Sequence, residues 1–135
     1  MKAKELMIDD WVLIDRPDKY AGAKAQIKSL IFHKEDDGQY FSVFIHDELG
    51  IVRREVFNED LRPIALTAEI LEKNGFVKGS YVGGFYSHWC PFRIYIAEGV
   101  GFSVLFDDEI HFTCTYIHQL QHALRLCGIE KEIEL

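Results

Sequence analysis

The chain has 135 residues, of which 48% are hydrophobic and 13% aromatic, and it carries a formal net charge of −7 at pH 7. This length and composition predict one domain or two small halves with a real core, and they exclude general disorder. The acidic balance holds in both halves, with ten Lys and Arg against thirteen Asp and Glu in residues 1–64 and five against nine in residues 65–135. A duplex-binding domain with a concentrated cationic face is therefore not expected.

The hydrophobic pattern predicts a cytoplasmic protein that does not enter a membrane. No apolar run approaches the roughly 18 residues of a membrane span, and the N-terminus lacks the hydrophobic run and cleavage signal of a secretory peptide. Cys90, Cys114 and Cys127 are widely spaced and form no Cys-x-x-Cys pair. We therefore expect reduced cysteines that act as small apolar residues, and no cofactor.

Short apolar runs separated by turn signals fill residues 1–64. Asp37-Gly38 is the strongest hairpin signal among them. We expect strands at 11–14, 23–32, 40–46 and 51–56, and residues 58–63 close this half. Four or five short strands joined by tight turns are typical of an SH3-like small β-barrel or a meander.

The expected strand at 23–32 leads to a candidate binding surface. Its odd-numbered residues 25–29 should face the core, and its even-numbered residues, including Lys24 and Lys28, should face the other side. Together with Arg54, these lysines would meet the phosphates of a single nucleic-acid strand whose bases stack on aromatic residues of the sheet. The alternative interpretation is an ordinary solvated sheet face with scattered charges.

Residues 65–135 predict a second half with a sheet and two helices. Thr67 caps a short helix at 68–74, which Asn74-Gly75 ends. Three later stretches alternate apolar and polar residues, as in an antiparallel sheet with one face exposed to solvent. They lie at 92–97, 102–107 and 110–115. Residues 131–135 should finish as an edge strand or fray. The hinge at 63–67 is short, so we expect the halves to pack together.

The clearest helix signal covers residues 116–127. Thr115 is the expected N-cap, and Gly128 suits the left-handed position after the helix. Apolar residues at helical spacing form the stripe that should cover the sheet: Ile117, Leu120, Leu124 and Cys127. The sequence thus predicts an α+β fold, in which an SH3-like small β-barrel or meander precedes an antiparallel sheet covered by a C-terminal helix.

His118 and His122 are the candidate metal ligands, because two histidines one helical turn apart can bind one ion. The zinc metalloprotease pattern is His-Glu-x-x-His, and here Gln119 takes the position of the general base. Both histidines project away from the apolar stripe, beside Arg125. We therefore expect solvated surface histidines, with a metal site as the alternative.

Two segments carry a resemblance to a known family. They are Leu66-Thr-Ala-Glu-Ile-Leu-Glu-Lys-Asn-Gly-Phe76 and the helix that begins Tyr116-Ile-His-Gln-Leu-Gln121. The chain resembles small uncharacterised proteins from the genomes and mobile elements of gut anaerobes. The resemblance implies a β-rich opening, a short helix, strands and a closing helix. It implies no activity, cofactor or catalytic residue.

The leading hypothesis for function is a non-enzymatic protein-interaction module that binds another protein or its own copy. It depends on aromatic residues spread over both faces of the expected strands, including Tyr40, Tyr86, Trp89 and Tyr95. Single-stranded nucleic-acid binding by the N-terminal half and metal binding by the paired histidines are the alternatives. No catalytic residue is expected.

Overall fold

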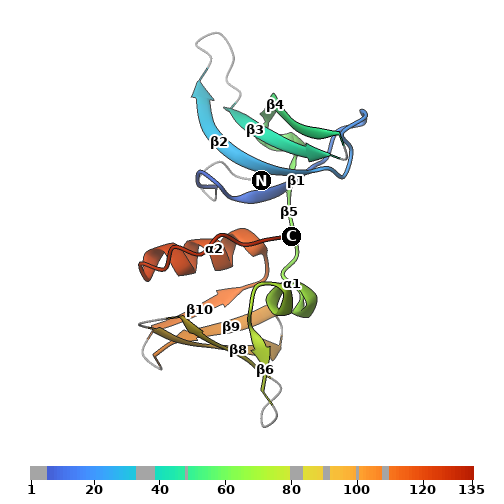
Figure 1. The fold of residues 1–135 in the computed structure, drawn as a ribbon. Coiled ribbons are helices and arrows are strands. Elements are labelled where there is room, and N and C mark those ends of the chain that lie inside the picture. The colour runs from blue at the N-terminus through green and yellow to red at the C-terminus, as the bar shows by residue number, and fades with distance from the viewer. Residues whose placement is uncertain are drawn as a thin grey trace. The chain divides into compact units, whose positions relative to one another are not determined.

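Two antiparallel sheets and two α-helices make up the described part of the chain, which confirms the α+β class (Figure 1). The structure is a computed structural model that describes residues 6–32, 39–47, 49–79, 84–89, 92–99, 101–107 and 110–135. The chain divides into two units, Met1–Ile64 and Ala65–Leu135. Each unit has a five-stranded sheet and buries apolar side chains of its own.

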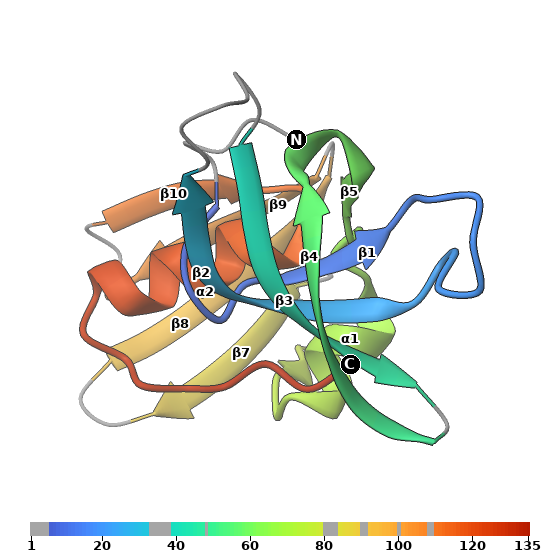
Figure 2. The same ribbon diagram turned by 90° about the horizontal axis from the view of Figure 1, so that it is seen from above.

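The first unit is one sheet with the strand order β4-β3-β2-β1-β5. Its elements are β1 (Trp11–Ile14), β2 (Lys24–Phe32), β3 (Gln39–Asp47), β4 (Gly50–Phe57), the 3-10 turn η2 (Asn58–Asp60) and β5 (Leu61–Pro63). Strands β2, β3 and β4 curve strongly along their length (Figure 2). Within the described residues no ladder joins β4 to β5, so no closed barrel is seen. The hairpin turn expected at Asp37-Gly38 lies outside these residues.

Residues 58–63, which were expected to close this half, do so with the turn η2 and the strand β5. Leu61 and Arg62 lie opposite Ile14 and Leu13 of β1 in an antiparallel ladder. Leu61 is fully buried, so its side chain holds the end of the unit against the core. A strand of three residues is too short to show an alternating pattern, and its sequence therefore gives no strand signal.

The core of the first unit follows the expected alternation up to Ile27 and departs from it afterwards. The register shifts between Ile27 and Ser29, so Ser29 lies opposite Ser42 and faces away from the core. The expectation that Ser29 shares a face with Ile27 is therefore wrong, since a β-bulge inserts one residue into the strand. The buried cluster consists of Val12, Ile14, Ala25, Ile27, Phe41, Val43, Ile45, Val56 and Leu61.

The second unit is a sheet with the strand order β10-β9-β8-β7-β6. Its strands are β6 (Val77–Lys78), β7 (Gly84–Trp89), β8 (Phe92–Gly99), β9 (Gly101–Phe106) and β10 (Ile110–Cys114), and its helices are α1 (Ala68–Lys73) and α2 (Ile117–Leu126). Phe85, Ile96 and Val104 lie opposite one another on adjacent strands and are all buried. The expected alternation is thus confirmed along β9, whereas on β10 Cys114 is buried and Ile110 is 46% exposed.

Helix α2 lies across one face of this sheet (Figure 1). The apolar stripe expected for it is buried at Ile117, Leu120 and Leu124. At its C-terminal end Gly128 has φ 73°. The N–H of Ile129 donates to the carbonyl of Leu124 at 2.9 Å, and that of Gly128 donates to the carbonyl of Arg125 at 3.0 Å. These two bonds form a Schellman motif, which confirms the expected role of Gly128.

The last residues neither form an edge strand nor fray, which corrects the expectation for 131–135. They run beside α1, where the side chain of Asn74 pairs with the backbone of Glu134. The Lys73 ammonium also donates to the main-chain oxygen of Leu135 at 2.6 Å. Ile133 is buried, so this segment contributes an apolar side chain as well as hydrogen bonds.

Candidate functional site

The loop between β1 and β2 is held in one shape by its own hydrogen bonds. The Gly22 N–H donates to the Ile14 carbonyl at 2.8 Å, and the Ile14 N–H donates to the Ala23 carbonyl at 2.9 Å. Gly22 has φ 75°, a left-handed conformation that favours glycine. The Tyr20 N–H donates to Oδ1 of Asp18 at 2.8 Å, a side-chain turn typical of aspartate. The loop therefore presents Tyr20 from a fixed backbone.

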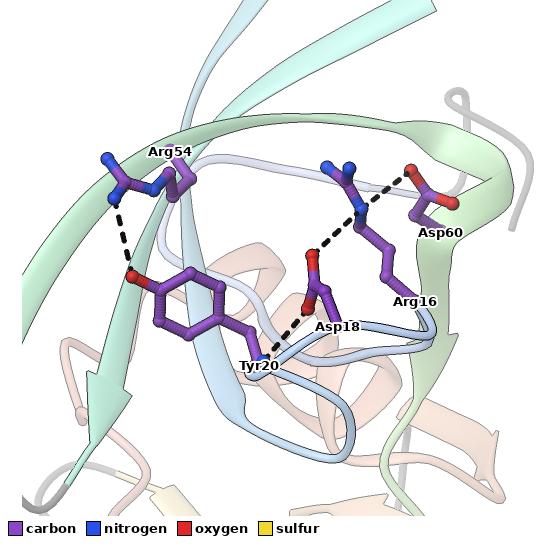
Figure 3. Close-up of polar contacts among 5 residues, drawn as sticks. All are labelled: Arg16, Asp18, Tyr20, Arg54 and Asp60. Carbon is purple, nitrogen blue, oxygen red and sulfur yellow. Dashed lines mark hydrogen bonds and ion pairs between the residues drawn. The ribbon is translucent and has the colours of Figure 1, made fainter.

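Arg16 ties this loop to the turn η2 (Figure 3). Its Nε lies 3.3 Å from Oδ2 of Asp18 and 3.8 Å from Oδ2 of Asp60. All three side chains are partly exposed, so each ion pair contributes at most about 1 kcal/mol to stability. The positive charge of Arg16 is nevertheless matched by two carboxylates within the site.

Arg54 reaches Tyr20 from the neighbouring edge strand β4 (Figure 3). Its Nη2 donates to the Tyr20 hydroxyl at 3.4 Å, and its guanidinium carbon lies 5.7 Å from the centre of the Tyr20 ring. Nη1 donates to the Arg53 carbonyl at 3.3 Å. Lys19 places its ammonium 4.9 Å from the same ring centre. Two cations thus lie against one tyrosine, an arrangement that the ring quadrupole favours.

A pocket of about 170 Å³ opens between these side chains. Its floor is apolar and consists of the buried residues Ile14, Ile45 and Val56, and its rim is polar and consists of Arg16, Asp18, Tyr20 and Arg54. Sites for cofactors and drug-sized ligands usually measure about 300–1,000 Å³. This pocket, which we call the Tyr20 pocket, therefore fits a single side chain better than a small-molecule substrate.

The sequence interpretation missed most of the Tyr20 pocket. Among the residues of the rim, the sequence had indicated only Arg54, and it had indicated Arg54 as a contact for phosphate. The Pro, Gly and aspartates of residues 15–22 predict a loop and no binding site. The available signal was a tyrosine that directly follows Asp18 and Lys19 in that loop. Its contact with β4 depends on strand pairing between residues distant in sequence, and no local pattern reports such pairing.

A larger hollow of about 370 Å³ lies in the second unit. It is lined by Gly75, Val77, Lys78, Gly79, Tyr86 and Ser87. Among these lining residues Lys78 alone carries a formal charge. We therefore place the candidate site at the Tyr20 pocket, where charged and aromatic groups surround an apolar floor.

The three residues proposed for phosphate contacts do not share one face of the first unit. Arg54 lies opposite Val43 on the core side of the sheet, whereas Arg53 lies opposite Phe44 on the outer side. Lys28 belongs to the outer side, with its ammonium 5.3 Å from the Phe44 ring centre and 2.5 Å from Oδ1 of Asp9. Lys24 lies on the outer side as well, opposite His46. The alternation of β4 thus separates Arg54 from both lysines.

Trp11 and His46 meet on the same outer side. Their ring centres are 4.8 Å apart, and Nε2 of His46 is buried without a hydrogen-bond partner. Burial lowers the pKa of His46 from its ordinary value of 6.5, and the positive charge of Lys28 lowers it further. The neutral imidazole is therefore the form that this environment favours.

We expect the stability of the protein to fall as the pH drops below 6.5, in part because of His46. The unfolded chain takes up the proton first, so His46 contributes stability above pH 6.5 that is lost as the pH falls towards its lowered pKa. NMR titration of the imidazole should give a midpoint below 6.5. In Lys28→Met the midpoint should rise, whereas Lys78→Met should leave it unchanged, because Lys78 is not among the charges that lower this pKa. A wild-type midpoint at or above 6.5 would contradict the assignment.

The paired histidines of α2 correct the expectation that both lie in water. His118 is only 4% exposed. Its ring stacks on that of Tyr116, with a centre distance of 5.9 Å and an interplanar angle of 8°. His122 is partly exposed, and its ring meets the His118 ring edge-on at 5.7 Å. The His118 ring thus packs against Tyr116 at the start of the helix, although helical spacing alone had placed it on the polar side.

Metal binding by His118 and His122 would require further ligands close to the two rings. In the parts of the chain that the structure describes, no three His, Cys, Asp or Glu side chains converge as a metal site would need. Burial also raises the pKa of the Cys114 thiol to about 12. The pKa of Cys127 is raised as well, first by burial and then by the charge of Asp107. Both thiols thus favour the protonated form, which is a poor nucleophile and a poor ligand.

Gln119 has a structural role that corrects the expected N-cap. Its Oε1 accepts from the Thr115 N–H at 2.7 Å and from the Tyr116 N–H at 3.0 Å. The N-cap is Tyr116 and not Thr115, because the helix begins at Ile117. Gln119 thus occupies the N3 position, from which a Gln or Glu side chain can reach back to the start of the helix.

Replacing Gln119 should test this role directly. Gln119→Ala removes both acceptor contacts, so we expect the free energy of unfolding to fall by about 0.5–2 kcal/mol. Gln119→Glu keeps the acceptor and places a negative charge at the helix N-terminus, so its stability should match the wild type or exceed it. Urea denaturation measures both values. An unchanged stability in Gln119→Ala would contradict the capping role.

Comparison with known proteins adds no family and no fold relative. No protein-family model, no curated protein and no solved structure matches the chain. Neither α1, with six residues, nor α2, with ten, is long and apolar enough to cross a membrane, and the described residues contain no other helix that does so. The function of the Tyr20 pocket must therefore be inferred from its own chemistry.

Proposed function

We propose that the protein is a non-enzymatic protein-interaction module whose first unit binds a segment of another protein at the Tyr20 pocket. The observation that carries this proposal is an apolar floor enclosed by tyrosine and arginine side chains. The tyrosine lies on a loop with a fixed backbone. Tyrosine and arginine are enriched among the residues that dominate binding energy at protein interfaces. A preorganised loop also loses little conformational freedom when a partner binds.

The strand arrangement supports the same proposal. We infer that the first unit is an SH3-like small barrel that is not fully closed. Four consecutive strands pair in order, and after the turn η2 strand β5 returns to pair with β1. Domains of this kind bind extended peptides in aromatic-lined grooves. Tyr20 lies on the loop between β1 and β2, next to the edge strand β4.

Selection of peptides on the intact chain tests the proposal. A displayed library of random peptides would be selected on the full-length protein, and the affinities of the enriched peptides measured by fluorescence anisotropy. We expect Tyr20→Ala to weaken binding about 30-fold or more, the loss typical of an interface hot spot. Phe57→Ala is the matched control, because Phe57 is an exposed aromatic residue of β4, and it should change affinity less than about threefold.

Two results would argue against the interaction module. One is a selection that enriches no peptide above the background. The other is a set of peptides that bind Tyr20→Ala as tightly as the wild type, which would place the binding surface elsewhere.

A further inference from the structure

The arginines of the first unit differ in how their charge is matched. Arg16 pairs with Asp18 and Asp60, and Arg62 pairs with Asp15 at 2.8 Å between Nε and Oδ2. Arg54, in contrast, donates to neutral acceptors, the Tyr20 hydroxyl and a backbone carbonyl. No carboxylate of a described residue lies within ion-pair distance of it. A guanidinium has five N–H donors, so Arg54 retains donors for a further ligand.

The mouth of the Tyr20 pocket is therefore locally positive in a chain whose net charge is −7. The charge of Arg16 is offset by carboxylates within the site, whereas Lys19 and Arg54 both lie against the Tyr20 ring, a neutral group. A planar guanidinium fork matches a carboxylate in geometry as well as in charge. Electrostatic complementarity of this kind selects an acidic partner over a basic one.

The spacing of Arg54 and Val56 limits the form that such a partner can take. They are two residues apart on β4 and point to the same side of the strand, where Val56 forms part of the pocket floor. Side chains two apart on an extended strand are about 7 Å apart. An extended segment running along β4 would therefore present its own i and i+2 side chains at the same spacing.

We propose that the Tyr20 pocket binds an extended protein segment in which an Asp or Glu lies two residues from an apolar side chain. Arg54 binds the carboxylate, and the apolar side chain fills the pocket over Ile14, Ile45 and Val56. The inference depends on the proposed function and specifies the chemistry of the partner.

A set of labelled ten-residue peptides tests the inference on the full-length chain. The reference peptide has Glu and Leu two positions apart, and its relatives replace Glu by Gln, replace Glu by Lys, or move Leu next to Glu. The protein variants are Arg54→Gln and Arg54→Glu, with Arg53→Gln as the matched control on the opposite face of β4. Affinities are measured by fluorescence anisotropy.

We expect replacement of Glu by Gln in the peptide to weaken binding about 10-fold or more, as loss of a charge-assisted hydrogen bond does. Arg54→Gln should weaken binding of the Glu peptide to the same extent and leave the Gln peptide unaffected. Arg54→Glu should prefer the Lys peptide. Adjacent Glu and Leu should bind more weakly than the i, i+2 pair, and Arg53→Gln should remain within about threefold of the wild type.

Other outcomes would overturn the inference in distinguishable ways. Peptides whose binding requires Tyr20 but is unchanged in Arg54→Gln would support the interaction module and contradict the proposed contact between Arg54 and a carboxylate. If no peptide bound, the proposed function itself would be contradicted. Displacement of the reference peptide by inorganic phosphate or a single-stranded oligonucleotide at lower concentrations than by unlabelled peptide would identify a phosphate ligand. A dimer in sedimentation that Arg54→Glu dissociates would identify a second copy of the chain as the occupant.

Discussion

Phe106→Ala should lower the free energy of unfolding of the second unit by about 3–5 kcal/mol, the range for deleting a buried aromatic side chain. Phe106 is 1% exposed. Its ring meets that of Phe112 edge-on, at a centre distance of 5.6 Å. The substitution removes both the buried apolar area and this aromatic contact, and the surrounding strands can collapse into the cavity only in part. Urea denaturation followed through the amide signals of β9 measures the loss.

The neighbouring residue provides the control for Phe106. Leu105→Ala removes a side chain on the opposite, partly exposed face of β9, so its effect should be less than half as large. Phe106→Leu should fall between the two, because it keeps most of the apolar volume. Equal losses for Phe106→Ala and Leu105→Ala would mean that the alternation of burial along β9 is wrong.

The alternation that makes Phe106 a core residue was visible in the sequence. Phe102, Val104 and Phe106 recur with period 2, which is the spacing of side chains on one face of a strand, and all three are buried. The stripe of α2 was visible for the same kind of reason, because its spacing of three and four residues is that of a helix face. Local periodicity thus reports which side of an element faces the core.

What the sequence could not show are contacts between elements that are distant along the chain. The bulge after Ile27 moves Ser29 to the other face, although residues 24–29 alternate without a break in the sequence. Arg54 was identified as a functional cation, but its partner Tyr20 precedes it by 34 residues and becomes a neighbour only after β4 and the β1–β2 loop are placed. His118 was expected in water, because helical spacing places it on the polar side and does not show the rings of Tyr116 and His122 that meet it.

Asn74→Ala should lower the free energy of unfolding of the second unit by about 2–4 kcal/mol. Asn74 is 2% exposed, and its side chain makes three hydrogen bonds. Nδ2 donates to the carbonyls of Ile70 and Glu134, each at 2.8 Å, and Oδ1 accepts from the Glu134 N–H at 2.7 Å. Alanine removes all three hydrogen bonds, each of which contributes about 0.5–1.5 kcal/mol to stability. Urea denaturation measures the change.

Asn74 also shows how a residue can have two roles of which the sequence reveals one. As expected, Asn74 and Gly75 end the helix α1. The amide of Asn74 also provides one donor and one acceptor to Glu134, as a backbone peptide in a neighbouring strand would. Hydrogen exchange separates these roles, because loss of the amide should expose the Glu134 N–H while the amides of α1 keep most of their protection. Glu72→Ala, on the exposed side of α1, should alter stability by less than about 0.5 kcal/mol. If Glu134 remained protected in Asn74→Ala, its N–H would have another acceptor. The packing of residues 129–135 against α1 would then depend on Ile133 and on the contact between Lys73 and Leu135.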